Sequence, residues 1–340
     1  MHLTSISIGS LIFGMLLSAG PSHAEDSTWV SMITEGDFDG KLFKNWTVRF
    51  AGKAVNDNID TTFRVSPEGY LWAYNHGTFS RTGFGHLYYT KKKYSYYLVR
   101  AEYRFTAEVS VSGAAEWTTQ NNGVMLHTPE PKDAAGDFPA SIEMQLLGPK
   151  NKNEDRIPTA DWPVGRTGNM CLAGDKFTIA YNGNSNYTNH CTTASYPNAW
   201  KGTQTPWETG WAETTARVLA DSLIQFSIHG QKIMELSQIR WTSDKSPVKD
   251  GYIAIQAEGA PTQFRKLEVL DLVGCMDKTS PSYRTYFVKN DAALCETVSG
   301  IPSIRSRSGT RRWQNGRRIG VHNRAGFPVG IYTLDGRVAE

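Results

Sequence analysis

The sequence contains few cysteines, modest charge and no hydrophobic run long enough for a comfortable membrane span. Of 340 residues, four are cysteine and 20% are charged. The apolar stretch at 6–19 is short and interrupted by glycine, so we expect no membrane-spanning helix. No amphipathic helix of three turns is apparent, and Thr214–Leu223 is only a marginal candidate. With 39% hydrophobic residues the chain has the composition of a globular protein, and these absences favour an all-β one.

The first residues have the layout of a secretory signal peptide. An apolar run is followed by Gly-Pro and by small residues that end at Ala24, before the first charged pair, Glu25-Asp26. The segment before the run lacks the usual Lys or Arg, and an ordinary buried helix is the alternative. We expect residues 1–24 to be removed and the mature protein to be exported, to the periplasm, the cell surface or the medium.

The chain has a formal net charge of +3, but the charge is unevenly distributed. Residues 297–340 contain eight Arg, no Lys and two acids, a net charge of +6, which leaves 28 basic and 31 acidic groups, or −3, in residues 25–296. The main domain has no basic bias, so we expect no nucleic-acid partner. The Arg-rich segment 297–340 is interpreted as a linker and solvated tail, in which 330–338 could form a strand; a sorting signal is the alternative.

The four cysteines fall into two pairs with equal spacing. Cys171 and Cys191 form one pair, and Cys275 and Cys295 form the other. In an exported chain an even set indicates disulfides, and 171–191 with 275–295 is the simplest of three connectivities. Zinc is the weaker alternative, because structural zinc sites use a short Cys-x-x-Cys spacing that is absent here.

Short runs with period-two alternation follow one another from residue 43 to 272. They are rich in Tyr, Val, Ile, Phe and Trp and are separated by Gly, Asn, Asp and Pro, which indicates about a dozen β-strands. No repeat of 40–50 residues is present, so a two-sheet antiparallel sandwich of jelly-roll type is favoured over a propeller. His229-Gly230 separates two runs and predicts a tight hairpin turn.

One strand sets a carboxylate and an amide on the same face. In the segment 141–147, Glu143 and Gln145 lie opposite Ile142, Met144 and Leu146, because alternate strand residues share a face. Other strands repeat the pattern. If all belong to one curved sheet, its concave face carries a polar set suited to a polyhydroxylated ligand: Glu102, Arg104, His127, Glu143, Gln145, Gln256, Glu258 and Arg265. The alternative is a solvated face of paired charges.

Several blocks, in the correct order, resemble the 3-keto-disaccharide hydrolase family. They are Phe84-Gly-His-Leu-Tyr-Tyr-Thr, Tyr97-Leu-Val-Arg-Ala-Glu-Tyr-Arg-Phe, Asn121-Asn-Gly-Val-Met-Leu-His, Phe138-Pro-Ala-Ser-Ile-Glu-Met-Gln-Leu-Leu-Gly and Gly251-Tyr-Ile-Ala-Ile-Gln-Ala-Glu-Gly. The resemblance covers roughly residues 28–275 and implies a concanavalin-like jelly roll over 28–274. It also implies a cysteine-bearing subgroup and a cysteine-closed appendage at 275–296, which supports the 275–295 pairing. Asn122 stands where Ser is common, and His229-Gly230 replaces the common Asn-Gly turn.

The resemblance implies cleavage of a 3-keto glycoside or disaccharide by proton abstraction at C2, β-elimination and hydration. Such a reaction needs a base, an acid at the glycosidic oxygen and donors at the enolate. Glu143 is the expected base and Gln145 a substrate ligand, with His127 as base or acid. Arg104 or Arg265 would stabilise the enolate, oriented by Glu102, and Gln256 and Glu258 complete the substrate-binding set. Metal is left open: a divalent cation could bind Glu143, His127 or His190, although no compact ligand motif supports it.

Two other functions remain as alternatives. A non-catalytic carbohydrate-binding module would use the same polar face for recognition alone. A hydrolase of unoxidised glycans would need two facing carboxylates. The chain lacks the Glu-x-Asp-x-x-Glu spacing of concanavalin-fold glucanases, which disfavours that second alternative.

Overall fold

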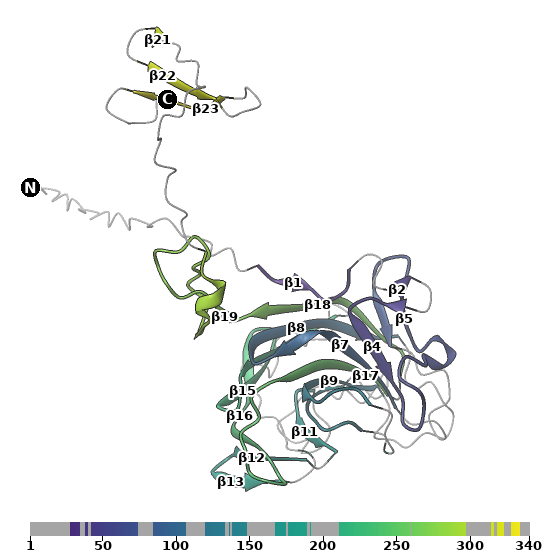
Figure 1. The fold of residues 1–340 in the computed structure, drawn as a ribbon. Coiled ribbons are helices and arrows are strands. Elements are labelled where there is room, and N and C mark those ends of the chain that lie inside the picture. The colour runs from purple at the N-terminus through teal and green to yellow at the C-terminus, as the bar shows by residue number, and fades with distance from the viewer. Residues whose placement is uncertain are drawn as a thin grey trace, which may run out of the picture. The chain divides into compact units, whose positions relative to one another are not determined.

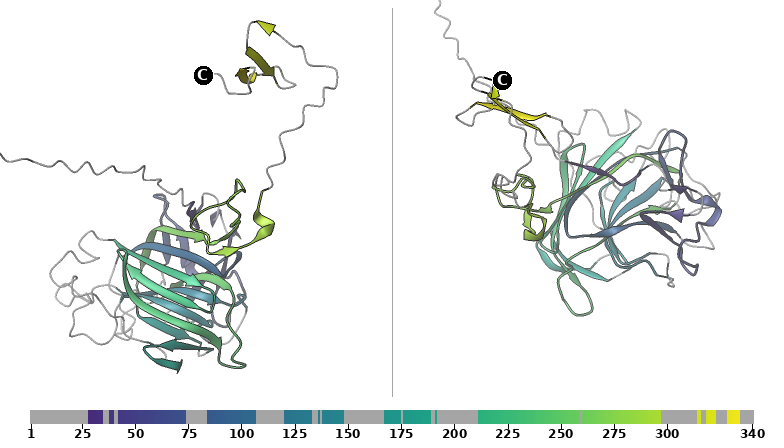
Figure 2. Two further views of the ribbon diagram at one scale, coloured as in Figure 1. Left: turned by 90° about the vertical axis from the view of Figure 1, so that its left-hand side faces the viewer. Right: turned by 45° about the horizontal axis from the view of Figure 1, so that its top comes forward.

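Two antiparallel sheets packed face to face form the main body of the protein (Figures 1 and 2). A computed structural model describes residues 28–34, 38–39, 42–73, 84–106, 120–132, 136, 138–147, 167–174, 176–188, 191, 211–258 and 260–296, with the strands at 314–315, 318–322 and 328–333. The chain divides into two compact units, Met1–Cys295 and Glu296–Glu340. The architecture is the all-β sandwich that the alternation predicts.

The larger sheet has ten strands. In spatial order these are β13 (Asn184–Tyr187), β12 (Phe177–Tyr181), β16 (Gln231–Trp241), β15 (Leu223–Ile228), β14 (Ala212–Leu219), β8 (Tyr96–Phe105), β18 (Thr262–Asp271), β6 (Leu71–Ala73) and β5 (Phe63–Val65), with β1 (Val30–Ser31) also pairing with β18. His229 and Gly230 join β15 to β16 with φ of 45° and 76°, so the predicted tight turn is present.

The smaller sheet has six strands. Their order is β11 (Met170–Ala173), β10 (Ser141–Leu147), β9 (Asn121–Thr128), β17 (Gly251–Ala257), β7 (Gly85–Tyr94) and β4 (Trp46–Arg49). Elsewhere β2 (Phe38–Asp39) pairs with β3 (Leu42–Phe43), and the described residues include two short 3₁₀ turns, η1 (Ile59–Thr61) and η4 (Ala292–Leu294).

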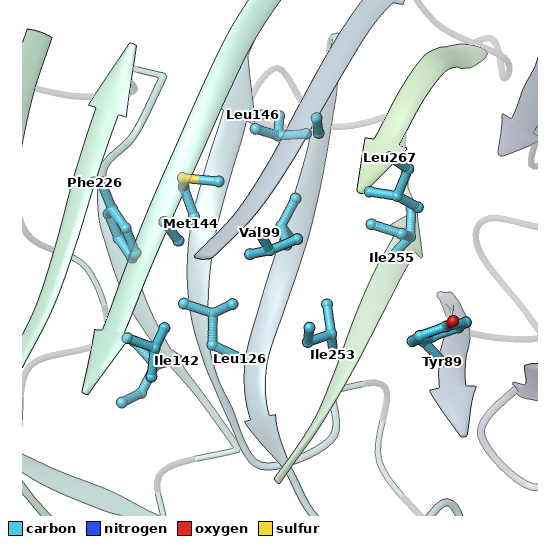
Figure 3. Packing of buried hydrophobic residues seen from close by; sticks show 14 of the residues in the cluster. Tyr89, Val99, Leu126, Ile142, Met144, Leu146, Phe226, Ile253, Ile255 and Leu267 are labelled. Atoms are coloured by element: carbon cyan, nitrogen blue, oxygen red, sulfur yellow. The ribbon is translucent and has the colours of Figure 1, made fainter. Parts of the chain in front are cut away.

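The core lies between the two sheets. Val99 and Leu267 of the larger sheet face Leu126, Met144 and Ile255 of the smaller one, and all five side chains are buried (Figure 3). Each comes from a strand in which apolar and polar residues alternate, so one face of every strand enters the core. The opposite faces of the two sheets therefore carry the polar residues.

The segment Thr214–Leu223 is not a helix. Most of it belongs to β14, in which Ala216 and Val218 are buried while Arg217 is exposed. This period of two is that of a strand, and the residues pair with β8 and β15 on either side.

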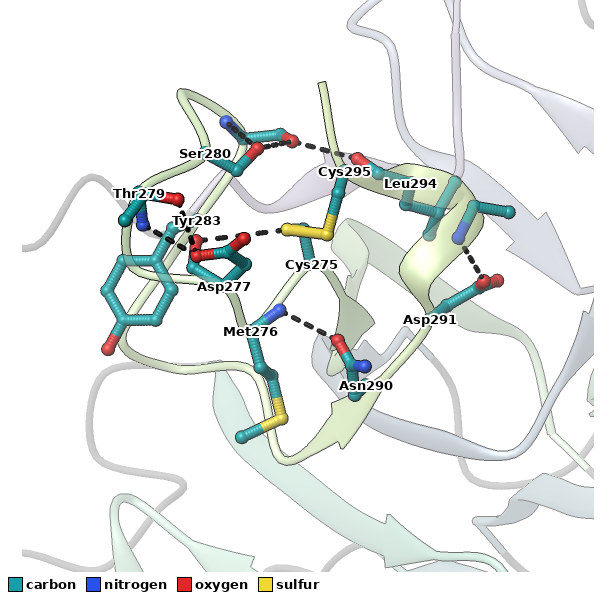
Figure 4. Close-up of a disulfide and its surroundings, with 12 residues drawn as sticks. Cys275, Met276, Asp277, Thr279, Ser280, Tyr283, Asn290, Asp291, Leu294 and Cys295 are labelled. Atoms are coloured by element: carbon teal, nitrogen blue, oxygen red, sulfur yellow. Dashed lines mark hydrogen bonds between the residues drawn. A yellow bond between two sulfur atoms is a disulfide. The ribbon is translucent and has the colours of Figure 1, made fainter. Parts of the chain in front are cut away.

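Both disulfides have the simplest pairing. Cys171 joins Cys191, and Cys275 joins Cys295. The second closes a small segment in which β19 (Val273–Gly274) pairs in parallel with β20 (Lys289–Asn290), and the Asn290 side chain accepts a hydrogen bond of 2.9 Å from the backbone N–H of Met276 (Figure 4). The first disulfide closes a segment that contains most of β11 together with β12 and β13, whereas the second fixes a loop-rich stretch that has little core of its own.

The second unit contains a small antiparallel sheet. Its strands are β21 (Gln314–Asn315), β22 (Arg318–His322) and β23 (Pro328–Thr333). The composition alone predicted a tail with at most one strand. The proposed signal peptide at 1–24 lies outside the described residues. Within the described part of the chain, no helix has the length and apolar character needed to cross a bilayer.

Candidate functional site

The polar side chains that the sequence placed on one strand lie on the outer face of the six-stranded sheet. Ile142, Met144 and Leu146 of β10 enter the core, so Glu143 and Gln145 face outward. Glu143 nevertheless keeps only 5% of its surface exposed. A carboxyl group so shielded from water must find partners or hold its proton.

The strand register explains how Glu143 is placed. It lies between Met125 of β9 and Cys171 of β11, while Gln145 lies opposite Gly123. A Cβ atom at Gly123 would come within 2.2 Å of Oε1 of Glu143. Glycine at this position therefore leaves the space that the Glu143 carboxyl group occupies.

Gln256 of β17 connects Glu143 to a second carboxyl group, that of Glu258. With its amide oriented to satisfy its hydrogen bonds, the Gln256 nitrogen donates to Oε1 of Glu143 and to Oε2 of Glu258, each at 3.1 Å. Gln256 is fully buried and Glu258 is 3% exposed. The three side chains form a buried carboxyl–amide–carboxyl triad, in which the two acids lie within reach of one nitrogen.

Burial controls the protonation of this triad. It raises the pKa of Glu143 to about 8. The pKa of Glu258 is also raised well above its usual range, first by burial and then by the charge of Glu143. The cause is visible in the neighbours, since an apolar cluster on the same face contains Tyr88, Met125 and Ala254. Near neutral pH the pair therefore retains a proton, and Glu143 is the first of the two to ionise.

These raised pKa values predict a pH-dependent stability. Below about pH 4.5 the two carboxyl groups are protonated in the folded protein and in the unfolded chain. Between about pH 4.5 and pH 8 the folded protein binds more protons than the unfolded chain, so the free energy of unfolding falls as pH rises. Each unit of raised pKa corresponds to about 1.4 kcal/mol. The double variant Glu143→Gln/Glu258→Gln should gain thermal stability relative to the parent at pH 8 but not at pH 4.5, as measured by calorimetry. If the double variant and the parent differ in thermal stability by the same amount at pH 4.5 and at pH 8, burial does not raise the pKa values of these two carboxyl groups.

Gln145 lies beside the triad with a more exposed side chain. Its Nε2 donates to Oδ1 of Asn121 at 2.9 Å, and its Oε1 lies 2.8 Å from the disulfide sulfur of Cys171. The sulfur carries no proton in the disulfide, so this second approach is a contact and not a hydrogen bond. Asn121 and the Cys171–Cys191 disulfide thus bracket Gln145 on the same sheet face as Glu143.

His86 and Arg49, which were not among the residues expected from the sequence, lie beside Gln256 on this sheet. The register places Arg49 of β4 opposite His86 of β7, and His86 opposite Gln256. His86 is fully buried, and burial together with the charge of Arg49 lowers its pKa to about 3, which keeps the ring neutral. Within the described residues neither ring nitrogen makes a hydrogen bond of good geometry. The alternation of His86 with Leu87 was the signal that could have placed it on this face.

His127 does not share the face of Glu143, contrary to the expectation from alternation. Its Nε2 lies 3.2 Å from the carbonyl oxygen of Ala220, in the turn between β14 and β15 of the other sheet. The backbone of His127 has a φ of 55°, and the pairing of β9 with β17 shifts between Tyr252 and Ala254. This irregularity ends the period of two before His127. The residue instead lines a cavity of about 260 Å³ with Trp241 and Lys249.

Glu102, Arg104 and Arg265 are also separated from Glu143. They lie on β8 and β18, in the ten-stranded sheet, and the expectation of one curved sheet is wrong for them. Glu102 accepts hydrogen bonds from Arg265 and Lys266, while Nε of Arg104 donates to Oε1 of Gln263 at 2.7 Å. Both sheets have a polar outer face, so alternation could not tell which sheet each strand joins.

No group of three or more His, Cys, Asp or Glu side chains is close enough to hold a metal ion within the described residues. His190, named as a third ligand from the sequence, lies outside them. Of the expected site, Glu143, Gln145, Gln256 and Glu258 come together on one face.

Residues 34–270 match a family model described as the 3-keto-alpha-glucoside-1,2-lyase-like domain. The chain belongs to this family. The match spans all six strands of the sheet that carries the triad and most of the other sheet. The family name points to an enzyme that acts on 3-keto sugars, and a carbohydrate-related function follows from membership.

Comparison with solved structures returns carbohydrate-binding domains at low similarity. The carbohydrate-binding module CBM66 from Bacillus subtilis is 8% identical and has a TM-score of 0.33, with 67% of this chain and 96% of that chain covered. The VIP36 exoplasmic/lumenal domain with Ca²⁺ and Man2 bound is 9% identical and has a TM-score of 0.39, with 74% and 90% covered. No curated protein matches the sequence.

Proposed function

We propose that this protein cleaves 3-keto glycosides by removing the proton on C2, eliminating the C1 substituent and hydrating the resulting enone. The observation that carries the proposal is the buried triad of Glu143, Gln256 and Glu258 in a chain of this family. Two carboxyl groups with raised pKa values, held by one amide, supply both a base and an acid near neutral pH.

The substrate explains why such a pair is useful. A ketone at C3 makes the hydrogen on C2 acidic, so a carboxylate can remove it and leave an enolate. When the enolate collapses, the bond between C1 and the glycosidic oxygen breaks and a C1–C2 double bond forms. Water then adds its oxygen to C1 and a proton returns to C2, so the net reaction is hydrolysis.

The two acids divide these tasks according to their environments. Glu143 ionises first and is the base at C2, because a catalytic base works best with a pKa near the operating pH. Glu258, whose pKa the Glu143 charge raises further, keeps its proton and donates it to the departing oxygen. Gln256 positions both groups, and Gln145 binds a hydroxyl or carbonyl oxygen of the sugar. During hydration the two roles reverse: the Glu258 carboxylate takes a proton from the attacking water, and protonated Glu143, after exchange with solvent, gives a proton to C2, so both groups regain their starting states.

A non-catalytic carbohydrate-binding module is the alternative function. Amides and carboxyl groups on a sheet face can bind sugar hydroxyls without any chemistry. Such a module has no need for two acids with raised pKa values, since burying them costs stability. An exported location fits either function, because two disulfides are typical of oxidising compartments.

The decisive experiment incubates the protein in D₂O with a 3-keto glucoside and, separately, with its unoxidised parent. Cleavage of the keto substrate alone, with deuterium incorporated at C2 of the sugar product, is expected by mass spectrometry and NMR. Equal cleavage of both substrates, or a product without deuterium at C2, would contradict elimination. Binding of the sugar without release of the aglycone would favour the binding module.

A further inference from the structure

The outer face of the ten-stranded sheet carries arginines and tryptophans in one register row. Arg64 of β5 lies opposite Trp72 of β6, Trp72 lies opposite Gln263 of β18, and Gln263 lies opposite Arg104 of β8. Trp211 extends the row, since the next residue, Ala212, pairs with Tyr103 beside Arg104. We call these five residues the arginine row. They face away from the core, because their neighbours along each strand are the buried ones.

The aromatic rings hold the cations of the arginine row in place. The guanidinium carbon of Arg64 lies 5.2 Å from the ring centre of Trp72. Those of Arg104 and Arg265 lie 4.5 Å and 4.7 Å from the ring centre of Trp211. Stacking of this kind orders long side chains before a ligand arrives, which lowers the entropic cost of binding.

A bulge adds further positive charge to the same place. The register of β18 shifts between Phe264 and Lys266, so Arg265 and Lys266 both reach Glu102. Counting Arg64 and Arg104 as well, four cations share this area with two carboxylates, those of Glu102 and of Glu213, which lies opposite Glu102 on β14. In the described residues the hydrogen bonds of Arg104 and Arg265 use Nε only, towards Gln263 and Glu102. Their terminal Nη groups keep donors available for an anion.

The row is long enough for a polymer. Neighbouring strands lie about 4.8 Å apart, so the three steps from β5 to β8 cover roughly 14 Å, more than one sugar ring occupies. Planar guanidinium groups match carboxylates through paired N–H donors. The geometry therefore suits an extended chain with repeated carboxylates.

We infer that the arginine row, with Arg265, binds an acidic polysaccharide whose sugars carry carboxylates, at a site separate from the Glu143 triad. The occupant is a polysaccharide because the chain belongs to a family that acts on sugars. Residues 25–296 carry a net charge of −3, so the positive charge is local and not that of a general polyanion binder. The inference does not depend on the proposed cleavage.

Calorimetric titration of the full chain with polygalacturonate tests this inference, with neutral dextran and single-stranded DNA as the other probes. Polygalacturonate should bind, and more weakly as salt rises. Arg104→Gln/Arg265→Gln should weaken binding at least about tenfold, since each lost charge-assisted hydrogen bond is worth about that factor. Arg64→Gln, at the far end of the row, should weaken it less.

The matched control removes two exposed cations away from the row. Lys91→Gln/Arg217→Gln should leave the affinity unchanged, and Glu143→Gln should bind as the parent does. Equal loss in the control pair, equal binding of dextran, or equal binding of single-stranded DNA would each overturn the inference. Loss of binding only in Glu143→Gln would place the polymer at the triad instead. Thermal unfolding of each variant establishes that it is folded.

Discussion

Replacing Glu143 by Gln is expected to reduce the rate of 3-keto glucoside cleavage by about 10²–10⁴-fold, the usual contribution of a general base. Gln has nearly the same shape and can still hydrogen-bond Gln256, but it cannot accept the C2 proton. The effect should fall on kcat more than on KM, since a sugar can still bind next to Gln145. Steady-state kinetics measures both constants, and exchange of the C2 hydrogen with solvent, followed by NMR, should disappear in the same variant.

The control for this variant is Glu235→Gln. Glu235 is an exposed residue of β16 whose carboxylate pairs with Lys232, so this variant makes the same Glu-to-Gln replacement away from the triad, on the other sheet. Its kinetic constants should match those of the parent. If Glu143→Gln retains parental kcat while the fold is intact, Glu143 is not the base.

Replacing Glu258 by Gln is expected to produce a loss that depends on the leaving group. For an alkyl glycoside, whose oxygen needs a proton as the C1–O bond breaks, we expect about 10²–10⁴-fold slower cleavage. For a nitrophenyl glycoside, whose oxygen leaves as a stable anion, the rate should stay within a few-fold of the parent. Initial rates with a series of 3-keto glycosides of graded leaving-group pKa measure this dependence.

The contrast between the two variants is the critical comparison. Glu143→Gln should slow every substrate equally, because C2 proton removal is needed whatever group departs. A uniform loss in Glu258→Gln would assign this residue to positioning Gln256 instead of donating the proton. No loss with any substrate would exclude both roles.

Alternation in the sequence identified the strands well because sandwich strands have one face in the core. The run 141–147 shows this clearly: Ile142, Met144 and Leu146 are buried between the sheets as predicted. The same rule failed for Thr214–Leu223, where Ala, Thr and Arg carry too weak an apolar signal to distinguish a strand from a helix. It also failed for His127, where an irregular backbone changes the side on which the residue lies.

The candidate site was predicted in part. Glu143, Gln145, Gln256 and Glu258 were named from alternation and do share a face. Arg104 and Arg265 were named by the same reasoning and lie on the other sheet. Strand pairing between residues more than 100 positions apart decides between these outcomes, and local periodicity contains no information about it.

The sequence by itself determined the fold class, the family, the spacing of the cysteine pairs and the side of each regular strand that faces the core. These properties depend on local patterning and on motifs that the chain carries in order. Only the tertiary structure decided which polar residues meet. It brought Gln256 between Glu143 and Glu258, placed His86 and Arg49 beside them, and moved the arginines to a second surface. The physical reason is that strand order and register, which create burial and raise the carboxyl pKa values, arise from long-range packing of the whole sandwich.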